Sequence, residues 1–248
     1  MKYIDMSAAS RLGCVRDNNE DMVLASGMLV RDGAMSTRLC LTGTERLVAA
    51  VADGMGGHNA GEVASEETLS NLRYFVSDLP AGLPPEELGS LLDGWLSSMN
   101  KILASKGSVN PDHYNMGTTL VAVICYGGRF FWINCGDSRL YRWRSGVLAL
   151  MSEDHVQPCT AAGADASGMI TNCIGAGCTT SYIDKREFTA DVKPGDVYVL
   201  CSDGLSDMLT DAVIESVVAS GGDADALCSS AIAAGGYDNV SVCMMKIV

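Results

Sequence analysis

The fold of this chain is organised around the stretch Val48-Ala49-Ala50-Val51-Ala52-Asp53-Gly54-Met55-Gly56-Gly57-His58. Its five apolar residues predict a buried strand, and that strand ends on the carboxylate of Asp53. The glycines that follow let the backbone approach a ligand closely. A carboxylate held at such a strand end is well placed to bind a metal ion, and burying it is costly if nothing pairs with it. The alternative is a glycine-rich turn in which Asp53 caps the next helix.

Composition limits the classes of protein to which the chain can belong. It has 248 residues, of which 48% are hydrophobic and 19% charged, which is typical of a globular protein with an ample core. Its formal net charge is −13 and no basic patch is visible, so we expect no nucleic-acid partner. The N-terminal residues do not resemble a signal peptide, and no apolar run reaches transmembrane length. We therefore expect a cytoplasmic protein with no membrane partner.

The cysteines raise the question of disulfides or a zinc site. There are ten, scattered mostly within apolar, strand-like runs such as those around Cys125, Cys135, Cys201 and Cys243. No pair has the CxxC spacing, and the three histidines lie far apart in the sequence, so a zinc cage is not expected. The pattern favours reduced, buried thiols.

Hydrophobic periodicity predicts an alternation of strands and helices. Helices are expected over residues 60–79, 86–106, 211–219 and 224–233. Strands are expected over residues 3–9, 22–25, 37–41, 47–52, 118–126, 129–135, 139–143, 182–188, 197–201 and 239–248, with 37–41 and 47–52 forming a pair. Gly127-Gly128 indicates a hairpin turn. Loops are expected over residues 26–36 and 153–177.

This order of elements predicts an α+β fold. Strands in hairpins, with helices in pairs between them, are typical of antiparallel sheets covered by helices. No repeat, linker or charge run divides the chain, so we expect a single domain over residues 1–248.

Several carboxylates share one local setting, at a strand edge and often beside a glycine. They are Glu20-Asp21, Asp53-Gly54, Asp203-Gly204 with Asp207, Asp238-Asn239, and Asp137 within Gly136-Asp137-Ser138-Arg139. Buried carboxylates at converging strand ends repel each other and persist only if cations hold them together. Oxygen ligands favour magnesium or manganese over zinc. One such Asp would be a cap or turn residue, but the set predicts a site for several hard metal ions.

The motifs together resemble those of the protein phosphatase 2C family, the metal-dependent serine/threonine phosphatases. The matching stretches are residues 16–21, 53–58, Gly117-Thr118-Thr119, 136–139, Glu153-Asp154-His155, 202–207 and Asp238-Asn239. Each is a weak signal alone, but they follow the family's order over nearly the whole chain. The form Asp-Gly-Met-Gly-Gly-His is similar to the bacterial branch.

The resemblance implies both a fold and a set of ligands. The implied fold is a four-layer α-β-β-α sandwich, two antiparallel sheets flanked by helix pairs, and the whole chain would be one catalytic domain. The cofactors would be two or three Mn²⁺ or Mg²⁺ ions. Asp53 would bridge two metals, and Gly54 would give one of them its carbonyl. The other implied ligands are Asp21 beside Asp53, directly or through a water, with Glu20 next to it; Asp203 and Asp238 at the other metal; and Asp137 and Asp207, with Asp203, at a third, weaker site.

The implied reaction is the hydrolysis of phosphoserine and phosphothreonine in proteins. Two metals about 3.5–4 Å apart can share a water, lower its pKa and aim the hydroxide at phosphorus in line. Arg16 would hold the phosphate through its permanently charged fork. The partners would be phosphorylated proteins, the substrates of a serine/threonine kinase, and the enzyme would act as a monomer.

The sequence departs from the family at two places. Met55 stands where eukaryotic members have a histidine, so His58 becomes the candidate for the acid that protonates the leaving oxygen. The alternative is that His58 is only a polar residue at the start of a helix. The flap segment, about residues 156–173, is short, and Asn172 stands where an arginine is common. We expect His155, just before the flap, to have a structural role.

Three other functions compete with this interpretation. Cys40 and Arg46 fit the Cys-x2-Gly-x2-Arg spacing of cysteine-dependent phosphatases, which use a thiolate nucleophile. However, Arg46 leads into a strand and not into a helix whose N-terminus could receive a phosphate. A metal-binding pseudophosphatase that serves as a signalling scaffold is the second alternative. A hydrolase of small phosphate esters is the third.

Overall fold

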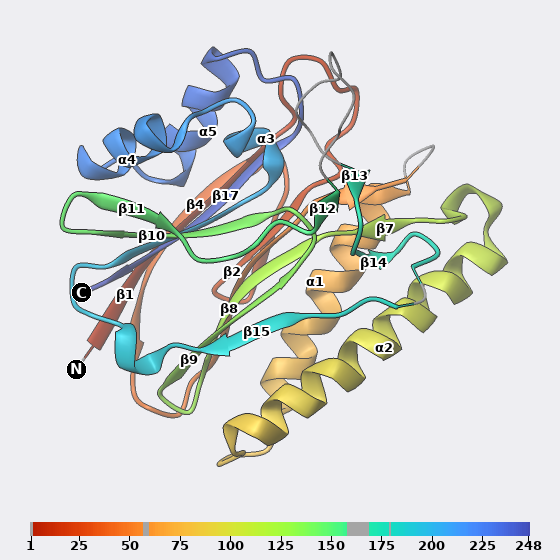
Figure 1. Cartoon of the computed structure of the whole chain (residues 1–248), viewed down its shortest axis with the longest axis horizontal. Coiled ribbons are helices and arrows are strands. Elements are labelled where there is room, and N and C mark those ends of the chain that lie inside the picture. The colour runs from red at the N-terminus through yellow and green to blue at the C-terminus, as the bar shows by residue number, and fades with distance from the viewer. Residues whose placement is uncertain (1, 57–59, 158–168, 179) are drawn as a thin grey trace.

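Two six-stranded antiparallel sheets form the centre of the computed structural model, which describes residues 2–56, 60–157, 169–178 and 180–248 (Figure 1). The first sheet has the order β11-β10-β16-β17-β1-β4. Its strands are β1 (Lys2–Arg11), β4 (Gly33–Leu41), β10 (Arg139–Arg144), β11 (Val147–Leu150), β16 (Val197–Cys201) and β17 (Val240–Ile247). The second sheet has the order β15-β9-β8-β5-β2-β3. Its strands are β2 (Met22–Ala25), β3 (Met28–Val30), β5 (Arg46–Ala52), β8 (Leu120–Tyr126), β9 (Arg129–Cys135) and β15 (Asp184–Glu187).

Helices cover the outer face of each sheet. The second sheet is covered by α1 (Gly61–Asp78) and α2 (Pro85–Val109), and the first by α3 (Asp203–Ser206), α4 (Asp211–Ala219) and α5 (Ala224–Ala233). The remaining elements are short. They are β6 (Gly54–Met55), β7 (Gly117–Thr118), β12 (Val156–Gln157), β13 (Met169–Ile170), β14 (Ile174–Gly175) and the 3₁₀ turns Pro111–His113 and Thr189–Asp191. None of the helices in the described residues is long and apolar enough to cross a bilayer.

Three apolar layers hold these elements together and confirm the expected α-β-β-α sandwich. One layer fills the space between the sheets, a second lies between the second sheet and α1 and α2, and a third lies between the first sheet and the C-terminal helices. Strand β5 shows how the sequence builds two of these layers at once. Ala49 and Val51 face the other sheet, while Val48, Ala50 and Ala52 face the helices. Burial of both faces explains why the strand is a continuous apolar run.

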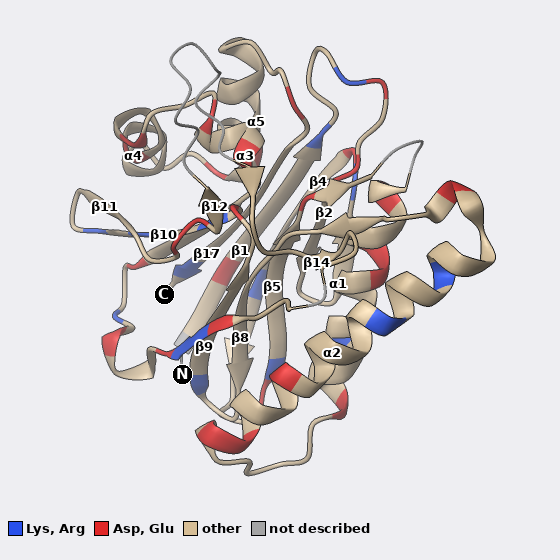
Figure 2. Ribbon diagram, turned by 45° about the vertical axis from the view of Figure 1, so that its right-hand side comes forward, with Lys and Arg blue, Asp and Glu red and all other residues tan. Residues whose placement is uncertain are grey.

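The antiparallel register gathers particular strand ends at one edge of the sandwich. β5, β9 and β16 end at this edge. β2, which is antiparallel to β5, and β10 and β17, which are antiparallel to β16, begin there. The loops that carry the acidic motifs join these ends, and Figure 2 shows acidic segments near α3 and β12 at this part of the molecule. The fold therefore brings together carboxylates that are far apart in the sequence.

Some local expectations were wrong, and packing explains why. Residues 26–36 are not one polar loop, because β3 and the start of β4 occupy most of them. Residues 37–41 and 47–52 do not pair with each other, since β4 pairs with β1 and β5 with β2 and β8. β4 lies at the edge of its sheet, and along it exposed residues alternate with partly buried ones. Because no residue of β4 is fully buried, its sequence resembles that of a loop.

The described cysteines match the expectation of free thiols. All nine are unpaired, and Cys125, Cys135, Cys201 and Cys243 are buried in the sheets. Burial raises the pKa of each of these four thiols and keeps them protonated.

Candidate metal centre

Five aspartates meet where the strand ends converge. Asp21 precedes β2, Asp53 follows β5, Asp137 lies between β9 and β10, Asp203 follows β16 and Asp238 precedes β17. Their charges act on one another: Asp21, Asp203 and Asp137 all raise the pKa of Asp53, and Asp238 raises that of Asp203. The structure thus brings together residues from the whole length of the chain, as the sequence predicted for these motifs.

Asp53 is held through its backbone by two neighbouring threonines. The Asp53 N–H donates to Thr119 Oγ1 at 3.0 Å. The Asp53 carbonyl accepts from Thr118 Oγ1 at 2.8 Å and from the Thr119 N–H at 2.9 Å. With both backbone groups bonded, the carboxylate remains available for other partners. Gly117-Thr118-Thr119, noted in the sequence as a motif, is thus the support of Asp53.

Asp21 is the most deeply buried of the set, with 1% of its surface exposed. Its Oδ2 accepts a hydrogen bond from Ser202 Oγ at 2.7 Å, and Ser202 Oγ accepts in turn from the Ser241 N–H at 3.0 Å. Burial raises the pKa of Asp21 to about 7, against the opposing effect of the serine hydrogen bonds. Ser202 lies next to Asp203, so one side chain links two of the acidic loops.

Burial and mutual repulsion also raise the pKa values of the remaining carboxyls. Burial and the charge of Asp203 raise the pKa of Asp137 to about 7. Burial and the charge of Asp238 raise the pKa of Asp203 to about 6. Burial and the charges of Asp21, Asp203 and Asp137 raise the pKa of Asp53 well above its ordinary value. No lysine, arginine or histidine among the described residues forms an ion pair with Asp53 or Asp203.

Unpartnered oxygens test whether these residues suit a metal ion. Oδ1 of Asp21, Oδ1 of Asp137 and Oδ1 of Asp203 are each buried and lack a hydrogen-bond partner. Orphaned buried oxygens are costly, and hard divalent cations take oxygen ligands of this kind. The donor set therefore fits magnesium or manganese. The cage is not pre-formed, however, because no three His, Cys, Asp or Glu side chains in the described ranges are close enough to enclose an ion as they stand.

Glu20 and Gly54 form a second part of the centre. A Cβ placed on Gly54 would lie 2.5 Å from the Glu20 carbonyl oxygen and 2.2 Å from that of Gly61. A Cβ on Gly61 would lie 2.6 Å from the Glu20 carboxylate. Two glycines thus allow the start of α1 and the Glu20 segment to close over the backbone of β6. Asp21 interacts with Asp203 and Asp238, whereas Glu20 lies beside Gly54 and Gly61.

Arg16 is an exposed cation at the edge of the centre. Its Nη2 donates to Asp238 Oδ2 at 2.6 Å, and its side chain is 57% exposed. The Asn239 N–H donates to Asp238 Oδ1 at 2.8 Å, so both oxygens of Asp238 are bonded. The charges of Asp53 and Glu20 also act on Arg16. The guanidinium therefore faces the carboxylates while most of its donors remain open to solvent.

Asn239 ties the N-terminal loop to the last strand. Its Oδ1 accepts from the Glu20 N–H at 2.9 Å, and its Nδ2 donates to the carbonyls of Leu12 and Asn18 at 2.9 and 3.0 Å. A Cβ on Gly204 would lie 2.0 Å from the Asn239 carbonyl oxygen, so the Asp203 and Asp238 loops touch through their backbones. The neutral Asn239 residue thus holds together the loops that carry Glu20-Asp21, Asp203 and Asp238.

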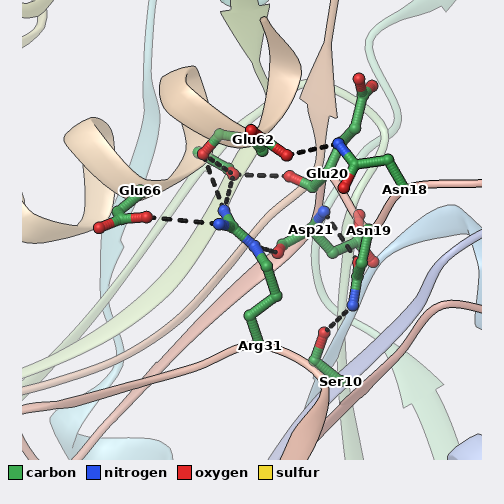
Figure 3. A network of polar contacts seen from close by, with 9 residues as sticks. Ser10, Asn18, Asn19, Glu20, Asp21, Arg31, Glu62 and Glu66 are labelled. Carbon is green, nitrogen blue, oxygen red and sulfur yellow. Dashed lines mark hydrogen bonds and ion pairs between the residues drawn. The ribbon is translucent and has the colours of Figure 1, made fainter. Parts of the chain in front are cut away.

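Arg31 supports the same loop and was missed by sequence reasoning. Figure 3 shows its side chain reaching from the end of β3 to the start of α1. Its Nε donates to the Asp21 carbonyl at 3.0 Å, and its Nη2 donates to the Glu62 carbonyl at 2.7 Å and to Ser65 Oγ at 3.1 Å. The only signal in the sequence was a charged residue in a stretch expected to be a polar loop.

The Asp137 turn is fixed from both sides. Ser138 Oγ and Thr119 Oγ1 lie 2.7 Å apart, and Arg139 forms a forked ion pair with Asp154. Asp207, expected at the third metal site, is exposed, and its N–H donates to the Asp203 carbonyl at 2.8 Å. The charges of Asp207 and Asp154 contribute to the raised pKa of Asp137, so Asp137, Asp203 and Asp207 lie near one another.

His155 has the structural role that was expected. Its Nδ1 accepts from the Gly136 N–H at 3.1 Å and lies 2.7 Å from Asn172 Nδ2. Because Nδ1 is an acceptor, Nε2 carries the proton and donates to Asp184 Oδ2 at 3.0 Å. The ring therefore connects the Asp137 turn with the end of the flap.

Two predicted features lie wholly or partly outside the described residues. The acid candidate His58 is one of them. Of the flap, residues 158–168 are outside, whereas β12 and β13 pair at its base.

The cysteine-phosphatase alternative lacks its loop. Cys40 lies within the extended strand β4, paired with Tyr3. The N–H groups of Thr42 and Gly43, which would have to receive a phosphate, donate to the Glu45 carboxylate. Arg46 Nε donates to the Leu79 carbonyl at 2.7 Å. No phosphate cradle forms around this thiol.

The apolar hollows of the surface lie away from the carboxylates. One of about 530 Å³ lies on the outer face of the first sheet, where Met6, Trp143 and Met244 line it. Another of about 310 Å³ lies between α2 and β15. Neither contains any of the five aspartates, so the candidate centre is a polar edge and not an apolar pocket.

Comparison with known proteins identifies what the chain resembles. Residues 23–222 match the sequence profile of the family described as protein phosphatase 2C. The serine/threonine protein phosphatase PstP of Mycobacterium tuberculosis is 33% identical over an alignment that covers 98% of this chain and 45% of PstP. The serine/threonine phosphatase stp of Listeria innocua is 30% identical, over 79% of this chain and 82% of that protein.

Solved structures share the fold. The catalytic domain of PstP in complex with two manganese ions is 30% identical, with a TM-score of 0.74 and coverage of 100% of both chains. This chain nevertheless spans only 45% of the length of the curated M. tuberculosis phosphatase.

The raised carboxyl pKa values predict how stability depends on pH in the presence of a chelator. A carboxyl whose pKa is higher in the folded state binds its proton more tightly there than in the unfolded chain, so stability falls as pH rises between the two values. For Asp21 this window runs from its ordinary value, about 4, to about 7. We expect the melting temperature in chelator to fall from about pH 4 to about pH 7, and Asp21→Asn to flatten that slope. Asp78→Asn, at an exposed position, is the matched control. Equal slopes for the wild type and Asp21→Asn would contradict the assignment.

Proposed function

The chain belongs to the protein phosphatase 2C family, and from that premise we infer that it hydrolyses phosphoserine and phosphothreonine in proteins. One observation carries the proposal beyond family membership. Buried carboxylates from opposite ends of the chain converge with raised pKa values, and three of them present an unpartnered oxygen. A fold gains nothing from such an arrangement unless cations complete it.

We propose that two or three Mn²⁺ or Mg²⁺ ions bind at this edge. Asp53, Asp203 and Asp238 would hold them, with the Gly54 carbonyl and Glu20 on one side and Asp137 and Asp207 on the other. Divalent ions at such a centre supply a water of lowered pKa and neutralise charge on the phosphoryl oxygens. Asp21 accepts a hydrogen bond from Ser202 through one oxygen, and its carboxyl lies close enough to Asp203 for the two charges to interact. It would therefore favour cation binding whether or not it touches an ion.

Arg16 would receive the phosphate of the substrate. Its guanidinium is permanently charged and planar, which matches two phosphate oxygens at once. The Asp238 contact at 2.6 Å fixes the direction of the guanidinium and leaves it 57% exposed. Substrate would thus be held between a fixed cation and the acidic edge. His58 is proposed as the donor of the proton that the leaving oxygen needs, and Met55 cannot supply one.

The open edge favours a protein substrate over a small phosphate ester. Small-molecule sites are usually enclosed hollows with apolar walls, and the hollows of this kind lie elsewhere on the molecule. We propose that the substrates are targets of a serine/threonine kinase and that the enzyme acts as a cytoplasmic monomer of one catalytic domain. Free thiols at all nine described cysteines suit a reducing compartment. The scaffold alternative has no observation in its favour, since competent ligands fill each proposed metal position.

Hydrolysis of phosphoserine, phosphothreonine and phosphotyrosine peptides, measured side by side, tests the proposed function. We expect turnover of the first two to vanish with chelator and to return when Mn²⁺ or Mg²⁺ is added, because the ligands are hard oxygens. Cys40→Ser should retain full activity. Activity that survives excess chelator but is lost in Cys40→Ser would overturn the metal mechanism, and inactivity under every metal would favour the scaffold.

Substitution of Arg16 separates phosphate binding from support of Asp238. If the guanidinium holds the phosphate, Arg16→Ala should raise KM about 10- to 100-fold, the usual worth of a charged hydrogen bond. Arg38→Ala, which removes an exposed arginine on β4, is the control and should leave KM unchanged. A normal KM in Arg16→Ala, with more Mn²⁺ needed for half-maximal activity, would show that Arg16 serves only Asp238.

A further inference from the structure

Two cysteines flank a tight turn beside the candidate centre. Gly175, Ala176 and Gly177 all have positive φ angles, 82°, 48° and 69°, and they reverse the chain after β14. The Cys178 N–H closes the turn by donating to the Gly175 carbonyl at 2.9 Å. The Cys173 thiol donates to the same carbonyl at 3.8 Å, so the Cys173 side chain and the Cys178 backbone meet at one oxygen, and each thiol acts on the pKa of the other. Two cysteines that a tight turn brings to the same carbonyl can be joined by a disulfide once their sulfurs approach to about 2.05 Å.

The two thiols differ in environment. Cys173 is 7% exposed, and burial together with the Cys178 thiol raises its pKa to about 11. Cys178 is only half-buried. Burial acts to raise the pKa of Cys178, but hydrogen bonds from Ser181, Thr180 and Cys173 outweigh it, and the pKa is lowered. A half-buried thiol whose pKa is lowered, beside a shielded thiol whose pKa is raised, is the usual pairing of an attacking and a resolving cysteine.

We propose that Cys178 and Cys173 are a redox modification site at which hydrogen peroxide produces a disulfide. In the first step the Cys178 sulfur attacks one peroxide oxygen, the O–O bond breaks, and Cys178 becomes a sulfenic acid with release of one water. In the second step the Cys173 thiol attacks the Cys178 sulfur, the S–O bond breaks, and the disulfide forms with release of a second water. The two thiols lose two electrons and two hydrogens, and peroxide is reduced to two waters.

The turn connects directly to the loops that carry the candidate ligands. Gly175 pairs with Gly117 in β7, and Thr118 of β7 pairs with Gly54 in β6. Thr118 also donates to the Asp53 carbonyl at 2.8 Å. Two strand pairings therefore separate the modified turn from Asp53 and Gly54.

A second path runs from the other side of the turn to the Asp137 loop. Asn172, next to Cys173, lies 2.7 Å from His155 Nδ1, and that nitrogen accepts the Gly136 N–H. A disulfide of about 2.05 Å would draw the two sulfurs closer than any hydrogen bond between them. Because both paths begin at the cysteine-flanked turn, we expect oxidation to disturb Asp53 and Asp137 together and to lower activity reversibly.

Other thiols of the chain provide matched controls. Cys135 lies near the pair, since both thiols contribute to its raised pKa, but it is fully buried, and burial is the main cause that keeps it protonated. Cys40 is exposed on β4, which pairs only with β1 among the described strands. Exposure without a resolving partner should make Cys40 oxidise to sulfenic or sulfinic acid, not to an intramolecular disulfide.

Peptide mapping of the full chain without reduction tests the modification independently of phosphatase activity. After dilute hydrogen peroxide in the presence of chelator, we expect a cross-linked species that joins Cys173 and Cys178 and is lighter by two hydrogens. Dithiothreitol should remove it, Cys178→Ser should abolish it, and Cys40→Ser should not affect it. A wild-type chain whose Cys178 is oxidised only to sulfinic acid, or that links other cysteines first, would overturn the proposal.

Activity with Mn²⁺ after removal of peroxide tests the coupling. We expect the oxidised wild type to lose about fivefold or more, in the range of ordinary coupling between sites, and dithiothreitol to restore it. Cys178→Ser should match the untreated wild type before and after peroxide. Equal loss in Cys178→Ser and the wild type would overturn the coupling. A chain inactive in all states would contradict the proposed function and not the disulfide, which the mass measures directly.

Discussion

Repulsion among buried carboxylates is the constraint on which this structure depends. Asp21, Asp53 and Asp203 lie within each other's electrostatic reach, and burial raises the pKa of each. No lysine or arginine among the described residues forms an ion pair with any of the three. Apolar burial in the sandwich must therefore offset the repulsion among the three carboxylates until divalent cations bind and reduce it.

The framework around the carboxylates does this mainly with neutral groups. Ser202, Thr119 and Asn239 hold acidic side chains or their backbones without cancelling their charge. Two of the nearby arginines leave Asp21, Asp53 and Asp203 without an ion pair. Arg31 donates to the backbone carbonyls of Asp21 and Glu62, and Arg16 pairs with Asp238 at the solvent edge. The negative charge remains available to cations, and the same backbone links extend to the cysteine-flanked turn.

The sequence could predict antiparallel sheets covered by helices, and the acidic candidates, because their signals are local, whereas the four-layer sandwich followed from the resemblance of the ordered motifs to the family. A buried strand that ends in Asp-Gly, as at Asp53 and Asp203, can be recognised from a few residues. Strand pairing could not be predicted in the same way, and the edge strand β4 was wrongly paired with β5 because register depends on distant partners. Arg31 and Asn239 were not recognised as supports since their partners are backbone groups on other elements, and no residue pattern records such contacts. The contact between Cys173 and Cys178 likewise depends on the turn that joins them.

Direct titration of the purified chain with Mn²⁺ by calorimetry tests the central claim, that the converging carboxylates are a metal centre. We expect saturable binding of at least two ions per chain, with release of protons near neutral pH because burial raises the pKa values of the ligand carboxyls. Asp53→Asn should remove most of this binding while the circular dichroism spectrum stays unchanged, and Asp78→Asn should bind as the wild type does. Unaltered Mn²⁺ binding in Asp53→Asn would show that the converging carboxylates are not a metal centre.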